Sequence, residues 1–344
     1  MITPDTTIAE LRKLIPDELF SHLIYDPSGT GAGRFSDENR SLKEIQANDP
    51  TWNAEDMAFG LNALCRNLEK EEVLWDVYGA EEITACPEKT VVKLIRFPGQ
   101  SDSLSIDTPR RTLILASGGA YGAVCHLPEA FPVAAEAAAS GIDCFCLTYR
   151  VGVKAPLFPA PMEDLGAGIR FLFAHESELD ISMEHYAVCG FSAGAHLTAT
   201  WGLQEFGYQK YRLPAPDALI LGYPMLNLWS ALSKMPEPVR NFMLTGMLGP
   251  DYSEESCKSY NIDENAKEDY PPCFIVHAQD DTTTDPRASA AFAASLVDKK
   301  ICCVTENPKH AGHGFGRGTG SDAEEWVKTA LGFWNDSAFS VKNI

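Results

Sequence analysis

The stretch that decides the fold runs from residue 186 to residue 196 and reads Tyr-Ala-Val-Cys-Gly-Phe-Ser-Ala-Gly-Ala-His. Its apolar first half ends in Gly-x-Ser-x-Gly around Ser192, and small residues suited to a helix follow. This order is typical of a sharp strand-to-helix turn that raises a serine hydroxyl above the edge of a sheet. Glycine on either side lets the strand and helix backbones pass where a β-carbon would not fit. The pattern predicts a buried strand, an accessible serine and a following helix.

From about residue 72 onward, strand-like and helix-like segments alternate. After an opening pair at 73–78 and 91–97, the predicted strands are continuous apolar runs, at 112–116, 143–149, 186–190, 217–222, 273–277 and 301–305. Continuous runs are the pattern of strands that are covered on both faces. The helix-like segments between them span residues 131–140, 161–175, 193–203, 286–296 and 322–334. This alternation predicts a doubly wound, mostly parallel α/β sheet with helices on both faces.

Two segments fall outside this alternation. Residues 1–70 are polar and helix-leaning, and the helix expected at 51–64 brings Trp52, Phe59 and Leu64 to an apolar face. Their apolar content is too low for an independent domain, so we expect an N-terminal extension or lid (1–70) packed against a catalytic domain (71–344). The stretch from about 226 to 270 contains proline and methionine and is expected to be an irregular insertion that overhangs the site.

Composition excludes several functions. The 344-residue chain has a formal net charge of -20, which argues against nucleic acid and anionic membranes as partners because their phosphates would be repelled. Most of the ten cysteines lie in apolar runs, where a thiol serves as a small hydrophobe, and none has the spacing of a zinc site. We therefore expect a reducing, cytoplasmic location, no metal and no cofactor. No signal peptide or membrane span is expected, and a homodimer stays open as an alternative.

A catalytic histidine is expected after the serine and the acid, because serine hydrolases with such a turn carry their triad in that order. Of the eight histidines, His310 and His313 alone follow the later acidic candidates. We favour His313, because its flanking glycines at 312 and 314 free the backbone to swing an imidazole over the sheet. His196 and His277 are interpreted as structural.

The acid is expected just past the predicted strand at 273–277. A carboxylate there would meet the histidine from the far side and fix its tautomer. Asp281 is our choice and Asp280 stays the alternative. Asp285 is less suitable, since Asp285-Pro286 reads as the cap and first turn of the next helix.

The oxyanion of a tetrahedral intermediate needs backbone N–H donors. Ala193, directly after the serine, is expected to supply one, and the loop Ser-Gly-Gly-Ala-Tyr-Gly at 117–122 the others. The same loop read alone could cradle a phosphate. It lacks the Gly-x-Gly-x-x-Gly spacing and a P-loop lysine, which argues against a dinucleotide site.

These segments resemble the α/β-hydrolase esterases related to hormone-sensitive lipase and to the bacterial acetyl-xylan and feruloyl esterase (BD-FAE-like) group. The resemblance covers roughly residues 72–335 and is carried by the turn around Ser192 and by residues 117–121, 148–150, 158–164, 222–224 and 312–315. It implies an α/β-hydrolase fold, oxyanion donors Gly119, Ala120 and Ala193, and a triad of Ser192, Asp281 and His313. Ser117 stands where the family usually has histidine, and the segment from Asp281 to Pro286 is one residue longer than usual.

The resulting expectation is a serine carboxylesterase that hydrolyses small short-acyl esters, above all acetyl esters, by an acyl-enzyme mechanism. Tyr121 and Gly118 are expected to contact the substrate. The family likeness implies a sugar as the alcohol, with Trp52 or Trp229 as a stacking surface. Two alternatives stay open: a peptidase or thioesterase on the same fold, and a non-catalytic binding protein.

Overall fold

A central sheet organises the molecule. The computed structural model describes residues 1–29, 37–100, 111–152, 156–233 and 235–340, with side chains to residue 336. Within these residues the sheet has eight strands in the order β1-β2-β4-β3-β5-β6-β7-β8. The strands are β1 (Leu74–Asp76), β2 (Lys93–Phe97), β3 (Thr112–Ala116), β4 (Asp143–Thr148), β5 (Ala187–Phe191), β6 (Ala218–Gly222), β7 (Cys273–Val276) and β8 (Cys303–Glu306).

The strand directions follow the sequence pattern. β1 and β2 pair antiparallel, with Leu74 opposite Ile95, and β2 pairs antiparallel with β4. The pairs from β3 to β8 are parallel. β3 to β6 are buried along their whole length, as continuous apolar runs require. The predicted doubly wound α/β sheet is confirmed.

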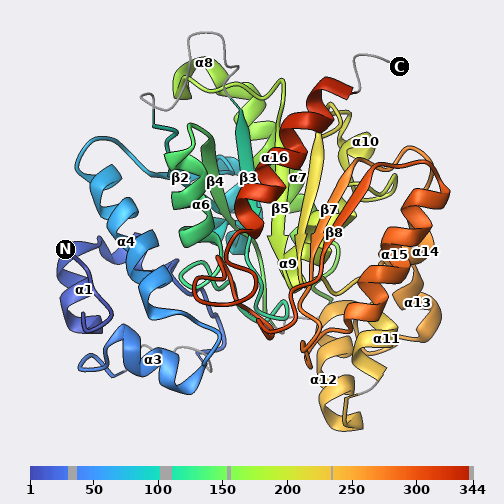
Figure 1. The fold of residues 1–344 in the computed structure, drawn as a ribbon, viewed down its shortest axis with the longest axis horizontal. Coiled ribbons are helices and arrows are strands. Elements are labelled where there is room, and N and C mark those ends of the chain that lie inside the picture. The colour runs from blue at the N-terminus through green and yellow to red at the C-terminus, as the bar shows by residue number, and fades with distance from the viewer. Residues whose placement is uncertain (30–36, 101–110, 153–155, 234, 341–344) are drawn as a thin grey trace.

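Helices cover both faces of the sheet (Figure 1). Alternate residues of one strand point to opposite faces, so Leu113 and Leu115 belong to one hydrophobic core and Ile114 to the other. The first core includes residues of α6 (Ala130–Ala139) and α16 (Trp326–Ser340). The second includes residues of α7 (Ala160–Ala174), α9 (Ala193–Thr200) and α15 (Pro286–Asp298).

The N-terminal segment continues the first core. It forms α1 (Ile8–Leu14), α2 (Asp17–Ser21), α3 (Leu42–Asn48) and α4 (Ala54–Leu68). Ile8, Leu11 and Leu61 are buried in the same cluster as α6. A β-carbon on Gly60 of α4 would lie 2.9 Å from the carbonyl carbon of Phe131, so α4 packs directly on α6.

The insertion at 226–270 is helical, which corrects the expectation of an irregular segment. It contains α11 (Leu228–Ser233), α12 (Glu237–Leu248), α13 (Glu254–Lys258) and α14 (Ile262–Asn265). α11 and α12 lie at the end of the molecule where the parallel strands finish (Figure 1). The N–H groups of Leu157 and Phe158 donate to the carbonyls of Gly246 and Met247, which ties α12 to the loop after β4.

Short helices complete the described chain, namely α5 (Ala80–Ala85), the 3-10 turn η2 (Pro87–Val91), α8 (Glu176–Leu179) and α10 (Tyr208–Tyr211). Among the described residues, no helix combines the length and apolar character needed to cross a bilayer.

Candidate active site

Ser192 occupies the turn between β5 and α9. Its backbone has φ 53° and ψ -117°, a conformation that costs a non-glycine residue free energy and that functional sites often use. A β-carbon on Gly190 would lie 2.2 Å from the carbonyl oxygen of Gly194. One on Gly194 would lie 2.1 Å from the carbonyl oxygen of Ala116. The two glycines are therefore required by the close approach of strand and helix, as the sequence predicts.

A continuous hydrogen-bonded chain joins Ser192, His313 and Asp281. Ser192 Oγ lies 2.9 Å from His313 Nε2, and His313 Nδ1 lies 2.7 Å from Asp281 Oδ2. Because a carboxylate oxygen can only accept, Nδ1 carries the proton and Nε2 is left as the acceptor for the serine hydroxyl. This is the arrangement of a nucleophile, a general base and a group that orients the base.

Asp281 is buried and accepts several hydrogen bonds. Besides His313, its donors are His277 Nε2 at 3.1 Å, the Thr283 N–H at 2.7 Å, and the N–H and hydroxyl of Thr284 at 3.0 and 2.9 Å. Burial raises the pKa of Asp281, but the hydrogen bonds from His277 and His313 outweigh it and hold that pKa well below its ordinary value. The carboxylate is therefore ionised wherever the histidine is needed as a base.

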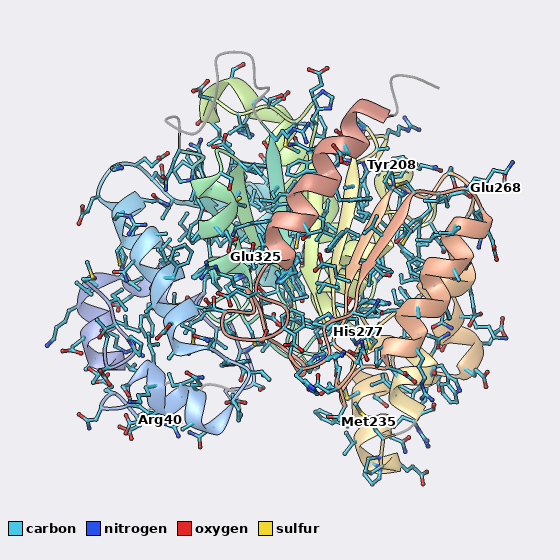
Figure 2. The ribbon with its side chains drawn as sticks, viewed as in Figure 1. Arg40, Tyr208, Met235, Glu268, His277 and Glu325 are labelled. Atoms are coloured by element: carbon cyan, nitrogen blue, oxygen red, sulfur yellow. The ribbon has the colours of Figure 1, made fainter. Side chains whose placement is uncertain are left out.

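Asp280 and His310, the alternatives to Asp281 and His313, make other contacts. Asp280 is partly exposed and accepts the N–H groups of Ala311 and Gly312, which fixes the start of the histidine loop. The side chain of His310 is 79% exposed and lies 3.6 Å from Asp280. His277 directly follows β7 at the lower edge of the sheet (Figure 2), where it is fully buried and adds a second imidazole to Asp281.

The loop after β3 is built to present backbone N–H groups. Gly119, Ala120 and Tyr121 have φ of 131°, 54° and 58°, and the Gly119 carbonyl accepts the N–H groups of Gly122 and Ala123. Within the described chain, the N–H groups of Gly119, Ala120 and Ala193 donate to no protein acceptor. The Ala193 N–H is one of the unsatisfied donors at the start of α9.

The two residues expected to contact the substrate, Tyr121 and Gly118, both make internal contacts in the structure. The Tyr121 side chain is buried, and its hydroxyl donates to His196 Nδ1 at 2.7 Å. The Gly118 N–H donates to Glu129 Oε2. The Tyr121 hydroxyl and the Gly118 N–H are therefore both engaged by protein groups. His196 is buried, as expected for a structural residue.

Sequence reasoning missed two polar side chains beneath the site. Glu129 is buried behind the loop after β3, and burial raises the pKa of its carboxyl to about 7 despite the Gly118 N–H. The Thr284 hydroxyl lies 2.9 Å from Asp281 Oδ2 and 3.2 Å from His313 Nδ1. The one available signal for Glu129 was a carboxylate in the otherwise apolar run at 127–135.

The N-terminal segment contacts both loops of the site. Tyr25 exchanges backbone hydrogen bonds with Val124, at 3.0 and 2.8 Å, next to the loop after β3. Asp56 of α4 is buried and accepts from Arg317 at 3.1 Å and from the Thr319 hydroxyl at 2.6 Å, on the loop that carries His313.

A cavity of about 560 Å³ adjoins the loop after β3, a size suited to a small organic ligand. Gly152 lines it and donates its N–H to the Tyr121 carbonyl at 2.9 Å. Its other walls come from residues on four segments, including Tyr25, Cys86, Val91, Arg150, Val151 and Leu157. In the part of the chain that the structure describes, no three His, Cys, Asp or Glu side chains gather as a metal site.

A serine on a strained strand-to-helix turn, hydrogen-bonded to a histidine that also contacts a buried carboxylate, is an arrangement typical of α/β-hydrolases. The BD-FAE family model matches residues 105–296, which is more than half of the chain. The chain belongs to the BD-FAE family.

Known proteins are similar over much of the chain. Endo-1,4-beta-xylanase B of Butyrivibrio fibrisolvens is 28% identical over 204 residues, 57% of this chain and 31% of that protein. The chain thus spans about a third of the length of this curated relative.

Two solved structures share the fold. The acetyl ester-xyloside bifunctional hydrolase of Caldicellulosiruptor lactoaceticus has a TM-score of 0.62 and 24% identity, covering 77% of this chain and 96% of its own. The butyrate-bound esterase Est2 of Thermogutta terrifontis has a TM-score of 0.58 and 19% identity, covering 78% and 93%.

Proposed function

We propose that this protein is a serine carboxylesterase that hydrolyses short-acyl esters, above all acetyl esters, of small alcohols such as sugars. The observation that carries the proposal is the hydrogen-bonded chain from Ser192 Oγ through His313 to Asp281. A serine in a merely structural position has no need of an oriented imidazole and a strained backbone.

In the proposed mechanism, His313 Nε2 removes the hydroxyl proton as Ser192 Oγ attacks the acyl carbonyl carbon. The resulting oxyanion is stabilised by the N–H groups of Gly119, Ala120 and Ala193, each worth about 3 kcal/mol of barrier. The intermediate collapses, the imidazolium protonates the leaving alcohol, and an acyl-Ser192 ester remains. Water, deprotonated by His313, then releases the carboxylic acid and regenerates the serine. Asp281 stabilises the imidazolium at both stages.

The substrate class rests on the relatives and on one tryptophan. One structural relative is described as acting on acetyl esters, another binds butyrate, and the curated relative is a xylanase. A β-carbon on Gly314, next to the catalytic histidine, would lie 3.7 Å from Trp52 Nε1. Trp52 is therefore the better placed of the two candidate stacking surfaces for a sugar. Trp229 lies on α11 in the helical insertion.

The test compares hydrolysis of p-nitrophenyl acetate, butyrate and octanoate by the wild type and by Ser192→Ala. An exposed serine on α11, Ser230, supplies the matched control Ser230→Ala. We expect activity to fall at least a thousandfold in Ser192→Ala alone, with acetate the best substrate, and labelling by a fluorophosphonate probe to disappear with it.

Three results would contradict the proposal. Residual activity above a thousandth of the wild type would exclude Ser192 as the nucleophile. Faster turnover of aminoacyl amides or acyl-CoA than of oxygen esters would instead assign a peptidase or a thioesterase, and no probe labelling would indicate a binding protein.

A further inference from the structure

Glu129 is a buried carboxyl group that the esterase mechanism does not use. It stands at the N-terminal end of α6 with 5% of its surface exposed. Its two oxygens accept from different elements: Oε2 from the Gly118 N–H at 2.5 Å, and Oε1 from the Tyr223 hydroxyl at 3.1 Å. A carboxyl group in this environment costs folding free energy unless its hydrogen bonds compensate.

The first bond fixes the peptide that precedes the oxyanion donors. The carbonyl of Ser117 accepts the Tyr149 hydroxyl at 2.7 Å, while the N–H of the same peptide unit, on Gly118, is held by Glu129. Both ends of this peptide are therefore fixed by buried side chains. Any rotation of it would turn the N–H groups of Gly119 and Ala120, which follow directly.

This peptide also lies against the nucleophile. A β-carbon on Gly118 would be 2.9 Å from the β-carbon of Ser192 and 3.2 Å from Glu129 Oε1. Ser192, Gly118 and the Glu129 carboxyl group are therefore closely packed against one another. A shift of the Gly118 peptide would change the distance between the oxyanion donors and the serine.

The second bond reaches the histidine loop. The Tyr223 hydroxyl that donates to Glu129 also accepts the Gly316 N–H at 3.2 Å. The Tyr223 ring packs edge-on against His313, with ring centroids 4.9 Å apart. One buried carboxyl group therefore connects the loop of the oxyanion donors to the loop of the general base.

We propose that Glu129 is a positioning residue of this active site, which holds the oxyanion donors and the His313 loop in register with Ser192. The inference rests on the proposed esterase function. It predicts that Glu129 variants lose transition-state stabilisation without losing substrate binding, because the Glu129 carboxyl group is buried and both its oxygens are bonded to protein donors.

The test separates the effect of the length of the Glu129 side chain from the effect of its charge. Glu129→Gln keeps an oxygen within reach of the Gly118 N–H but removes the charge. Glu129→Asp keeps the charge but retracts the carboxylate by one methylene group. We expect kcat for p-nitrophenyl acetate to fall about 100-fold in Glu129→Asp and less than about tenfold in Glu129→Gln, since loss of one oxyanion donor costs about 10²–10³ in kcat.

Two further readouts exclude a general structural effect. KM should stay within threefold of the wild type in both variants, and affinity for a boronic acid that mimics the tetrahedral intermediate should fall in parallel with kcat/KM. If Glu129→Asp does not fold, Tyr223→Phe replaces it. That variant cuts the link to Gly316 and leaves Gly118 untouched, so kcat should fall about tenfold.

The inference is overturned if Glu129→Asp (or Tyr223→Phe in its place) has a kcat within threefold of the wild type, or if Glu129→Asp is more active than Glu129→Gln. It is also overturned if KM rises while kcat stays constant. Failure of the esterase proposal would look different: the wild type itself would lack activity, or Ser192→Ala would retain it.

Discussion

Asp56 offers a sharp test of whether the N-terminal segment supports the catalytic loops. Its carboxylate is 1% exposed and accepts from Arg317, from the Thr319 hydroxyl and from the Thr319 N–H at 3.3 Å. Asn53, the cap of α4, also binds this loop by donating its side-chain amide to the Thr319 carbonyl. Asp56→Ala would remove the central acceptor of this contact.

The expected loss can be worked from these bonds. Removing one partner of a buried ion pair costs about 3–5 kcal/mol, because the other is left uncompensated. Arg317 is 27% exposed and keeps its bond to Glu136, so part of the loss is recovered. We expect the free energy of unfolding to fall by about 3 kcal/mol, which is roughly 1 M in the urea midpoint at a slope of about 3 kcal/mol/M.

Activity should fall as well. His313 lies four residues before Arg317 on the same loop, and a displacement of about 1 Å at a reacting group costs about 100-fold. We therefore expect kcat to fall about 10- to 100-fold. Both quantities are measured by urea unfolding and by steady-state hydrolysis of p-nitrophenyl acetate.

The matched control is Glu55→Ala. Glu55 is the exposed carboxylate beside Asp56 in the first turn of α4, so its loss has the same effect on the helix dipole. If Asp56→Ala lowers the midpoint no further than Glu55→Ala and leaves kcat within threefold, α4 does not hold the histidine loop and the reasoning is refuted.

Three other predictions follow from the site. Asp281→Asn should lower kcat on the order of 10⁴-fold by removing the charge that orients His313, whereas Asp280→Asn should cost about tenfold at most; equal losses would contradict the assignment of the acid. Burial raises the pKa of Glu129 to about 7, which favours the neutral carboxyl group in the folded state. The resulting contribution to the free energy of unfolding is fully present below the unfolded pKa of about 4.5, and it is lost as the pH rises through 7. Glu129→Gln does not titrate and so avoids this loss. In urea unfolding, its stability relative to the wild type should therefore increase from pH 5 to pH 8, and the opposite trend would exclude a raised pKa. Gly194→Ala should prevent folding or lower the free energy of unfolding by several kcal/mol, because the added β-carbon would lie 2.1 Å from the Ala116 carbonyl oxygen. Gly332→Ala on α16 has open space around it and should raise the free energy of unfolding by about 0.5–1 kcal/mol. Comparable urea midpoints for the two variants would contradict this packing.

The strands, and the side chains of Ser192, Asp281 and His313 that the structure brings together, could be predicted because their signals are local. Continuous apolar runs located β3 to β8 to within a residue or two at most ends. The glycines around Ser192 marked the close backbone approach that the structure shows. Chain order left few histidines to choose from, and the glycines beside His313 favoured it over His310.

What sequence reasoning missed depends on how the chain turns in three dimensions. Tyr121 was expected at the substrate, and its burial and its hydrogen bond to His196, 75 residues away, could not be read from the local pattern. The helical insertion was expected to be irregular because it contains proline and methionine. Pro236 and Pro238, however, lie at the start of α12, where a missing N–H costs nothing.

Glu129 was missed for a related reason. Its partners, Gly118 and Tyr223, are 11 and 94 residues away along the chain, and no local pattern connects them. The bonds between Asp56 and the histidine loop span an even longer separation. Such pairings become visible only when the sheet brings the carboxyl ends of its strands to one edge.

The bond between Asp56 and Arg317 also sets an order of events during synthesis. The two residues are 261 positions apart, so at about 5–20 residues per second a ribosome delivers the second partner tens of seconds after the first. Until then Asp56 lacks the Arg317 guanidinium, and Ser192 has been synthesised without His313. If the proposed mechanism holds, a nascent chain therefore gains activity only near the end of its synthesis.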